Sequence, residues 1–260
     1  SQLGSERDLI EGLQLGSLQV TCVSTAPLAG FTDSFLVFDL PFLFETSEQA
    51  RAVMDSDVGT EILNSVEDQG LKGLAWFENG FRNVTNNVKP ITVPDDLKGI
   101  KIRTMENQMH MAAFQIMGAD PTPMAMGDVF TALQQGTIDA QENPYEVIVS
   151  NNLYEQQDYI VETNHLPHLI SLIVNDEFYQ DLTPDQQKIM TQAAQTATAY
   201  AREQSDERIA DKIAVIEDSG TEIITLSDET RAQIRQASQS VYDSIKKTIH
   251  TDIYNAYLDN

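Results

Sequence analysis

Hydrophobic and polar positions alternate along the chain with two periods, one typical of amphipathic helices and one typical of strands. Near the start, Ser5 and Asp8 have the spacing of a helix capping box, and Gly16 is placed to end that helix. A strand over residues 18–23 follows. The same patterns predict further strands at residues 71–77, 81–85, 99–103, 137–141, 158–163, 168–176 and 221–226, and further helices at residues 46–68, 106–117, 128–135, from 144 and, as the last helix, from 227. This succession predicts an α/β protein.

One predicted helix, residues 184–217, is unusually long. Thr183 is a good cap, Pro184 suits the first helical position, and Gln186 completes a capping box. At 1.5 Å per residue the helix would span about 50 Å, which exceeds the diameter of a small lobe. An isolated coiled coil would need sustained heptads, which the sequence lacks. We therefore expect this helix to lie across two lobes as a brace.

Two stretches of the chain are similar to each other. LQLGSLQVTCVST (residues 13–25) and LQQGTIDAQENPY (residues 133–145) align without gaps as helix end, glycine and strand. Polar side chains follow each strand, Ser24 and Thr25 in the first copy and Asn143 in the second. A common type of helix terminus explains the similarity equally well. If it reflects a repeat, the chain has two similar lobes whose strand ends line a ligand-binding cleft from both sides.

Arg103 ends the strand over residues 99–103, at the edge where such a cleft would lie. Its planar guanidinium suits a carboxylate ligand better than a lysine would. A strand-end arginine is also commonly a solvated partner of nearby acids, in this chain Glu106. Both interpretations stay open on the residues alone.

Composition restricts the partners of the protein. Forty acidic and 16 basic residues give a net charge of −24, which repels nucleic-acid backbones and anionic lipid surfaces. No apolar run approaches the roughly 20 residues of a membrane span, so we expect no membrane insertion. The first residues lack the order of a secretion signal, so we expect either no export or a signal that has been removed. The single cysteine, Cys22, follows an alternating strand pattern and is expected to be a buried, inert thiol.

Motifs for catalysis and metal binding are weak. His165 and His168 flank a proline with no cysteine or third histidine nearby, so no metal is expected. The sequence contains no glycine-rich phosphate loop before a helix and no nucleophile elbow. The residues therefore predict a two-lobed binder of a small anionic molecule, without catalytic residues, cofactor or metal. A hydrolase of similar layout is the alternative.

Longer motifs resemble one known family over essentially the whole chain. They are FDLPFLF (residues 38–44), LKGLAWFENGFRNVTN (71–86), PDDLKGIKIRTMEN (94–107), MGADPTPMAMGDVFTALQQGTIDAQENP (117–144) and TNH (163–165). In this order they resemble the solute-binding proteins of tripartite ATP-independent periplasmic (TRAP) transporters, of the C4-dicarboxylate-binding DctP type. DLKGIKIR, GADPTPM and ALQQGTIDAQENP are the most specific of these motifs.

The resemblance implies a two-lobed periplasmic binding protein fold of the α/β class, similar to class II, with a long helix bracing both lobes. The implied first lobe is residues 1–80 with about 169–208, and the second is residues 81–168 with about 209–236. Residues 237–260 would form a C-terminal helix that packs on the lobes. The opening strand and helix of the family's first lobe, which contribute a pocket wall, are expected to be absent from this sequence.

The resemblance also implies a set of ligand-binding residues. Arg103 matches the arginine that makes a bidentate bond to the ligand carboxylate, and Arg82 matches a second charged contact. Asn143 matches a residue that hydrogen-bonds the ligand near the same carboxylate. Met126 stands where relatives often have an aromatic residue, which leaves the ligand shape open. The remaining candidates are Ser24 and Thr25 on the opposite wall, Trp76 and Phe77 as apolar surface, Glu106, and His165 near the hinge.

Two of these candidates have a second expected role. Glu106 would either bond hydroxyl or amino groups of a ligand or, as we favour, cap the following helix. The lobes are expected to hinge through the strands that cross near Arg82 and His165.

The function implied by the resemblance is capture of an organic acid in the cleft and its delivery to the membrane subunits of a TRAP permease. The protein would be a monomer in the periplasm, or lipid-anchored outside a Gram-positive cell, and it would perform no covalent chemistry. Dicarboxylates, sugar acids, hydroxy acids and ectoine-like solutes stay open as ligands. The alternatives are a hydrolase or lyase that acts on a small anionic substrate, with Glu106, Glu142 or His165 transferring protons, and a ligand sensor.

Overall fold

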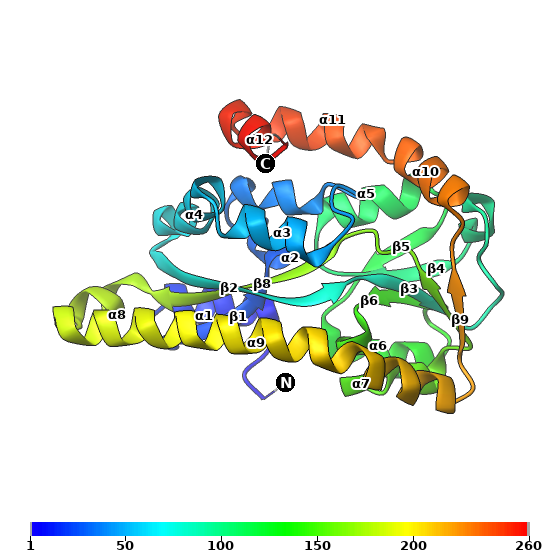
Figure 1. The fold of residues 1–260 in the computed structure, drawn as a ribbon, viewed down its shortest axis with the longest axis horizontal. Coiled ribbons are helices and arrows are strands. Elements are labelled where there is room, and N and C mark those ends of the chain that lie inside the picture. The colour runs from blue at the N-terminus through cyan, green and yellow to red at the C-terminus, as the bar shows by residue number, and fades with distance from the viewer. Residues whose placement is uncertain (1, 259–260) are drawn as a thin grey trace.

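The computed structural model describes residues 2–258 and contains two β-sheets (Figure 1). The first sheet has the order β1 (Val20–Ser24), β8 (Pro167–Asn175), β2 (Leu71–Phe81), and both of its pairs are antiparallel. The second is mixed, with the order β5 (Asp120–Pro123), β4 (Lys101–Thr104), β6 (Ala140–Asn143), β3 (Asn83–Asn86), β7 (Tyr159–Glu162), β9 (Glu222–Thr225). The predicted α/β architecture with two lobes is therefore confirmed.

Helices surround the two sheets. The α-helices are α1 (Glu6–Gln14), α2 (Thr25–Leu28), α3 (Ser47–Met54), α4 (Asp57–Asn64), α5 (Gln108–Ile116), α6 (Met126–Gln134), α7 (Tyr145–Ser150), α8 (Asp176–Asp181), α9 (Pro184–Asp218), α10 (Asp228–Ala237), α11 (Gln239–Thr248) and α12 (Thr251–Leu258). The 3-10 helices are η1 (Asp33–Asp39), η2 (Ser65–Gln69), η3 (Pro94–Leu97) and η4 (Leu153–Gln156). In Figure 1, α3 and α4 cover one face of the first sheet and α9 covers the other.

The sheets are joined by two short crossings of the chain, which we call the inter-sheet crossings. One is Arg82, between β2 and β3, and the other is residues 163–166, between β7 and β8. They hydrogen-bond to each other, with 2.8 Å from Arg82 N to Leu166 O and 3.3 Å from His165 N to Arg82 O. Residues in these crossings therefore lie between the lobes.

Helix α9 is the predicted brace. Thr183 caps it, and the capping box with Gln186 is present. The helix contacts β2 of the first sheet and α7, which follows β6 of the second (Figure 1). Ion pairs also tie it to the first lobe, with Asp206 2.7 Å from Arg51 and Arg202 2.7 Å from Asp55.

Two predicted helices were wrong in detail. The helix expected at residues 46–68 is divided into α3, α4 and η2, because Ser56 accepts a hydrogen bond from Gly59 N and begins a new helix. The last helix, expected from residue 227 onward, is divided into α10, α11 and α12 by a break at Ser238 and an extended residue at Ile249. Helices α11 and α12 contribute Val241, Ile245 and Tyr257 to the first hydrophobic core.

Cys22 is exposed, so the prediction that its thiol is buried was wrong. Strand β1 is an edge strand of its sheet, and successive side chains along it point to opposite faces. Val23 is buried on one face, and Cys22 lies on the other. Partial burial still raises the pKa of the Cys22 thiol above its ordinary value.

The two similar stretches have the same local structure. Gly16 and Gly136 both adopt left-handed conformations, with φ of 71° and 67°. The N–H of each glycine donates at 3.0 Å to an equivalent carbonyl, that of Leu13 in one copy and of Leu133 in the other. Each glycine leads to a strand that ends at a short helix, β1 before α2 and β6 before α7. The similarity is therefore structural, with one copy in each sheet.

Candidate functional site

Arg103 is buried at the end of β4, with 3% of its surface exposed. Its Nε and Nη2 donate to Met124 O at 2.8 and 2.6 Å. No carboxylate among residues 2–258 pairs with it, and Glu106 is exposed and not bonded to it. The interpretation as a solvated partner of Glu106 was therefore wrong. Desolvation is the main cause that lowers the pKa of Arg103 to about 10.

Arg82 forms a buried ion pair with Glu142 of β6. Nε donates to Glu142 Oε2 at 2.5 Å, while Nη2 donates to Oε1 at 2.8 Å and to the Glu142 carbonyl at 2.6 Å. Nη1 of Arg82 is buried without a partner. The two nitrogens with which Arg82 could grip a ligand carboxylate, Nε and Nη2, are therefore already bonded to Glu142, and Nη1 is the nitrogen left without a partner.

His165 joins this ion pair from the second inter-sheet crossing. Its Nε2 lies 3.1 Å from Glu142 Oε2, and Thr163 Oγ1 lies 2.8 Å from its Nδ1. Burial alone would raise the pKa of Glu142, but Arg82 and His165 outweigh it and hold this pKa well below its ordinary value. Burial lowers the pKa of His165 despite Glu142. The group thus connects β6 to both inter-sheet crossings.

Asn143 and Met126 lie beside each other near the ends of β6 and β5. Asn143 is buried, and its Nδ2 donates to Gln141 Oε1 at 2.6 Å and lies 4.0 Å from Met126 Sδ. Met126 begins α6, two residues after the carbonyl that holds Arg103. The predicted second-lobe residues Arg103, Asn143 and Met126 therefore occupy the strand-end region of one sheet.

Ser24 and Thr25 are buried where β1 meets α2, on the first lobe. Ser24 N donates to Glu6 Oε1 at 2.6 Å, and Ser24 Oγ lies 2.9 Å from His168 Nε2. A small cavity, which we call the Arg82 cavity, is lined by Ser24, Thr25 and Arg82 together with residues of the second lobe. The structure therefore brings together predicted residues of the two walls at this cavity.

Three other predicted residues lie elsewhere. Trp76 is in the first core, with ring centroids 5.1 Å from Phe38 and 5.7 Å from Phe35, and its Nε1 donates to Gly59 O at 3.3 Å. Phe77 lines a separate groove. Glu106 is exposed before α5. Its expected role as a helix cap was wrong, as described next.

Asn107, not Glu106, caps α5. Its Oδ1 accepts from the N–H groups of Met109 at 2.8 Å and His110 at 3.2 Å. Its Nδ2 donates to Asp39 Oδ2 at 2.7 Å and to Ala26 O at 3.0 Å. One amide therefore fixes the start of α5 against the first lobe.

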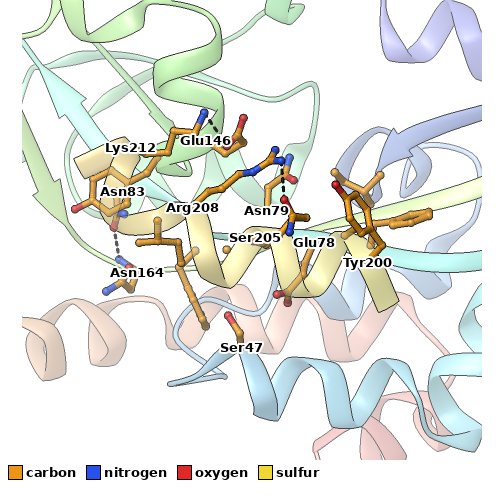
Figure 2. A pocket seen from close by; sticks show the side chains of 18 of the residues that line it. Ser47, Glu78, Asn79, Asn83, Glu146, Asn164, Tyr200, Ser205, Arg208 and Lys212 are labelled. Carbon is orange, nitrogen blue, oxygen red and sulfur yellow. Dashed lines mark hydrogen bonds and ion pairs between the residues drawn. The ribbon is translucent and has the colours of Figure 1, made fainter. Parts of the chain in front are cut away.

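A larger groove of about 540 Å³ lies between β2, α7 and α9 (Figure 2). Its basic residues are Arg208, which is exposed and bonded to Gln204 Oε1 at 2.6 Å, and Lys212, which lies 3.1 Å from Glu146. Neither Arg82 nor Arg103 lines it. An exposed arginine gains less from an anion than a desolvated one, so Arg103 is the stronger candidate for a carboxylate.

The sequence analysis did not predict that Glu142 forms a buried ion pair. It also did not predict that Asp39, His110 and His168 are buried polar residues of the site. A usable signal was present in Gln141, Glu142 and Asn143, three consecutive polar residues that are all buried in or beside a predicted strand. Consecutive buried polar residues need partners on both faces of a sheet, so they indicate a polar network. The partners of Asp39 and His168 are far away in sequence and gave no local signal.

Other types of site were also considered within residues 2–258. No group of three or more histidine, cysteine, aspartate or glutamate side chains there is arranged to hold a metal ion. No helix in that range combines the length and the apolar character that crossing a membrane requires.

Comparison with known proteins gives a consistent result. The sequence profile of the DctP family, described as bacterial extracellular solute-binding protein, family 7, matches residues 1–248. The 2,3-diketo-L-gulonate-binding periplasmic protein of Escherichia coli is 36% identical over 86% of this chain and 69% of its own length.

Two solved structures have closely similar folds. The sugar acid binding protein of Advenella mimigardefordensis, in complex with galactonate, has a TM-score of 0.96 and 36% identity and covers 99% of this chain and 83% of its own. A TRAP periplasmic solute-binding protein of Shewanella oneidensis with bound succinate has a TM-score of 0.95 and 30% identity, covering 100% of this chain and 85% of its own. The chain belongs to family 7 of the bacterial extracellular solute-binding proteins, the DctP family of TRAP transporters, as its motifs predicted.

Proposed function

We propose that the protein binds a small organic acid between its lobes, with the ligand carboxylate on Arg103, and delivers the acid to the membrane subunits of a TRAP permease. The observation that carries this proposal is the burial of Arg103 without a carboxylate partner within residues 2–258. A desolvated guanidinium is stabilised strongly by an anion, and a carboxylate matches its two parallel donors.

The other site residues have distinct roles in this proposal. Asn143 and Met126 are beside the carboxylate on the second lobe, where Asn143 supplies a hydrogen bond and Met126 an adaptable apolar contact. Ser24 and Thr25 line the Arg82 cavity from the first lobe, where Arg82 offers its unpaired Nη1. The ligand class is organic acids in the size range of succinate and galactonate, the ligands of two similar proteins.

Two lobes that move as units would allow capture and release. We infer that the first lobe is residues 1–80 with about 169–208 and the second is residues 81–168 with about 209–236, a division that follows the two sheets except at Phe81, Pro167 and His168, which belong to strands of the first sheet. We infer that the predicted C-terminal segment packs mainly on the first lobe, and the contribution of α11 and α12 to the first core supports this for residues 239–258. The inter-sheet crossings at Arg82 and His165 are then the hinge, and the long helix α9 limits its movement.

Binding without turnover fits the chemistry of the site. Glu142 and His165, two of the proton-transfer groups that an enzyme would use, are bonded to each other, and Glu142 is also bonded to Arg82. A carboxylate held charged by a buried arginine is a poor general acid. We place the protein in the periplasm, consistent with its membership of an extracellular family.

A thermal-shift screen tests this function. The purified protein is heated with D-galactonate, succinate, a neutral sugar or an amino acid. A ligand at 100 times its Kd adds about 2.7 kcal/mol of stability, which corresponds to an increase in Tm of roughly 5–10 °C for a chain of this size. At least one acid should give such a shift and the neutral sugar should not. If no organic acid shifts Tm at millimolar concentration, the proposed function is refuted.

A further inference from the structure

The Arg82 cavity has a chemical character that the carboxylate site does not explain. Its polar lining comes from Ser24, Thr25, Asp39, Arg82, His110 and His168, and its volume of about 10 Å³ is close to what one water-sized group needs. Each of these six side chains is more than nine-tenths buried. The cavity is therefore a small polar site enclosed by residues from distant parts of the chain.

Three residues that line this cavity each carry an unpaired buried nitrogen. They are Arg82 Nη1, His110 Nδ1 and His168 Nδ1, and none of them has a hydrogen-bond partner among residues 2–258. A buried donor or acceptor without a partner is costly, so native proteins rarely leave several in one place. Three such atoms around one cavity indicate a polar group that is bound there.

The hydrogen-bonding capacities of these atoms differ. Arg82 Nη1 is always a donor. The Asp39 carboxylate accepts from Asn107 Nδ2 at 2.7 Å and lies 2.9 Å from His110 Nε2, so Nε2 faces an acceptor. In the tautomer that carries its hydrogen on Nε2, Nδ1 of His110 is free to accept from a group in the cavity.

His168 adds a third contact of variable character. Its Nε2 lies 2.9 Å from Ser24 Oγ, which either donates or accepts, so His168 Nδ1 can take the complementary role. Burial holds the pKa of His168 well below its ordinary value, which keeps the ring neutral. The cavity thus offers one fixed donor, Arg82 Nη1, and two histidine nitrogens whose roles follow the tautomer of each ring.

We propose that the Arg82 cavity is a hydroxyl subsite, in which a hydroxyl group of the bound acid accepts from Arg82 Nη1 and donates to His110 Nδ1. This inference rests on the proposed function, since it assigns the part of the ligand beyond its carboxylate. It makes the ligand a hydroxylated carboxylic acid. His110 and His168 are then the residues that determine specificity.

Other ligand groups fit this cavity less well. A second carboxylate, with its two oxygens, is larger than the single water-sized group that a cavity of about 10 Å³ holds, and an ammonium group would be repelled by Arg82 and cannot accept from it. A methylene group would leave all three nitrogens unpaired. A hydroxyl matches because it donates and accepts at once, and a single buried water has the same capacity.

The experiment compares acids that differ in their hydroxyl groups. Isothermal titration calorimetry measures the Kd of D-galactonate, of hexanoate, which has the same carbon number without hydroxyls, and of succinate. The purified protein should bind galactonate at least about tenfold more tightly than hexanoate, because hexanoate leaves the cavity nitrogens unpaired. The variant His110→Phe keeps a ring of similar size and removes the acceptor. It should bind galactonate about 10- to 100-fold more weakly, with little change for hexanoate.

Two further variants complete the design. His250→Phe is the matched control, since His250 is exposed outside the site, and it should leave every Kd unchanged. If circular dichroism shows that His110→Phe is not folded, His168→Phe is used in its place. This variant should also reduce the preference for galactonate over hexanoate.

The outcomes separate this inference from the proposed function. If His110→Phe or His168→Phe keeps the ratio of the galactonate and hexanoate Kd values within threefold of the unmodified protein, the cavity holds only a structural water and the subsite is refuted. Binding of succinate but not galactonate, or equal binding of galactonate and hexanoate, also refutes the subsite, while carboxylate capture stands. Binding of none of the three acids contradicts the capture function itself.

Discussion

Replacement of Arg103 by alanine is the most direct test of the carboxylate site. The substitution removes a guanidinium that is 3% exposed and whose bonds within residues 2–258 go to the carbonyl of Met124. In the unliganded protein the substitution removes two hydrogen bonds, which is destabilising, and also removes a desolvated cation, which is stabilising. Because these two effects oppose each other, the Tm should change by a few degrees at most. The bound ligand, in contrast, loses the partner of its carboxylate.

The expected loss of affinity follows from the state of this side chain. Burial lowers the pKa of Arg103 to about 10, which corresponds to roughly 3 kcal/mol of weakened stabilisation of its charged form. A bound carboxylate restores that stabilisation, and Arg103→Ala forfeits it. We therefore expect binding to weaken by about 3 kcal/mol, or roughly 150-fold, within the range of 2–5 kcal/mol typical of buried charge pairs.

Calorimetric titration with the acid that gives the largest thermal shift measures this loss. Arg103→Lys keeps the charge but not the planar fork, so it should weaken binding by about tenfold. Arg208→Ala is the matched control, because Arg208 is exposed and lines the larger groove between β2, α7 and α9 (Figure 2). A Kd for Arg103→Ala within threefold of the unmodified protein, together with a weaker Arg208→Ala, would show that the anion binds in the groove and that the reasoning from burial is wrong.

Three further predictions concern stability. Glu142→Gln leaves two buried basic side chains without their carboxylate and should lower the free energy of unfolding in urea by about 3–5 kcal/mol, and a loss below about 1 kcal/mol would contradict the ion pair. Because burial depresses the pKa of His168, the unfolded chain binds more protons below about pH 6.5. The free energy of unfolding should therefore fall as pH decreases from 6.5, and His168→Gln should flatten that slope by up to about 1.4 kcal/mol per pH unit. Gly16→Ala and Gly136→Ala should each cost about 1–2 kcal/mol and match within about 0.5 kcal/mol, since both positions are left-handed with open space around them, and unequal losses in urea unfolding would argue against equivalent copies.

Local signals in the sequence were enough for much of the fold. The capping box at Thr183 and the proline after it predicted the start of α9, and the strand patterns predicted every strand of the two sheets except β5. The helix expected at residues 46–68 was wrong because Ser56 was not recognised as a cap inside a continuous hydrophobic pattern. The burial of Cys22 was wrong for a different reason: alternation assigns residues to faces, but contacts distant in sequence determine which face is covered.

The candidate site shows the same limit more clearly. Arg103 was identifiable as a strand-end arginine, but its burial depends on the loop that carries Met124, 21 residues away. Arg82 and Glu142 are 60 residues apart, and their pairing follows from the antiparallel register of β3 and β6, in which Asn83 is opposite Asn143. No local pattern specifies that register, so the ion pair required the structure.

The contrast between the two arginines explains how a chain with a net charge of −24 can hold an anion. Long-range repulsion from surface carboxylates is screened beyond about 8 Å at physiological salt, so binding depends on the groups within that distance. Arg82 is neutralised there by Glu142, whereas Arg103 has carbonyl contacts and no carboxylate partner within residues 2–258. If both were paired internally, the site would have no net attraction for an anion. Within residues 2–258, Arg82 is paired with a carboxylate and Arg103 is not, while Glu142, Glu6 and Glu106 act on Arg103 only at longer range. In the proposed site, the ligand carboxylate supplies the direct partner that this desolvated guanidinium lacks.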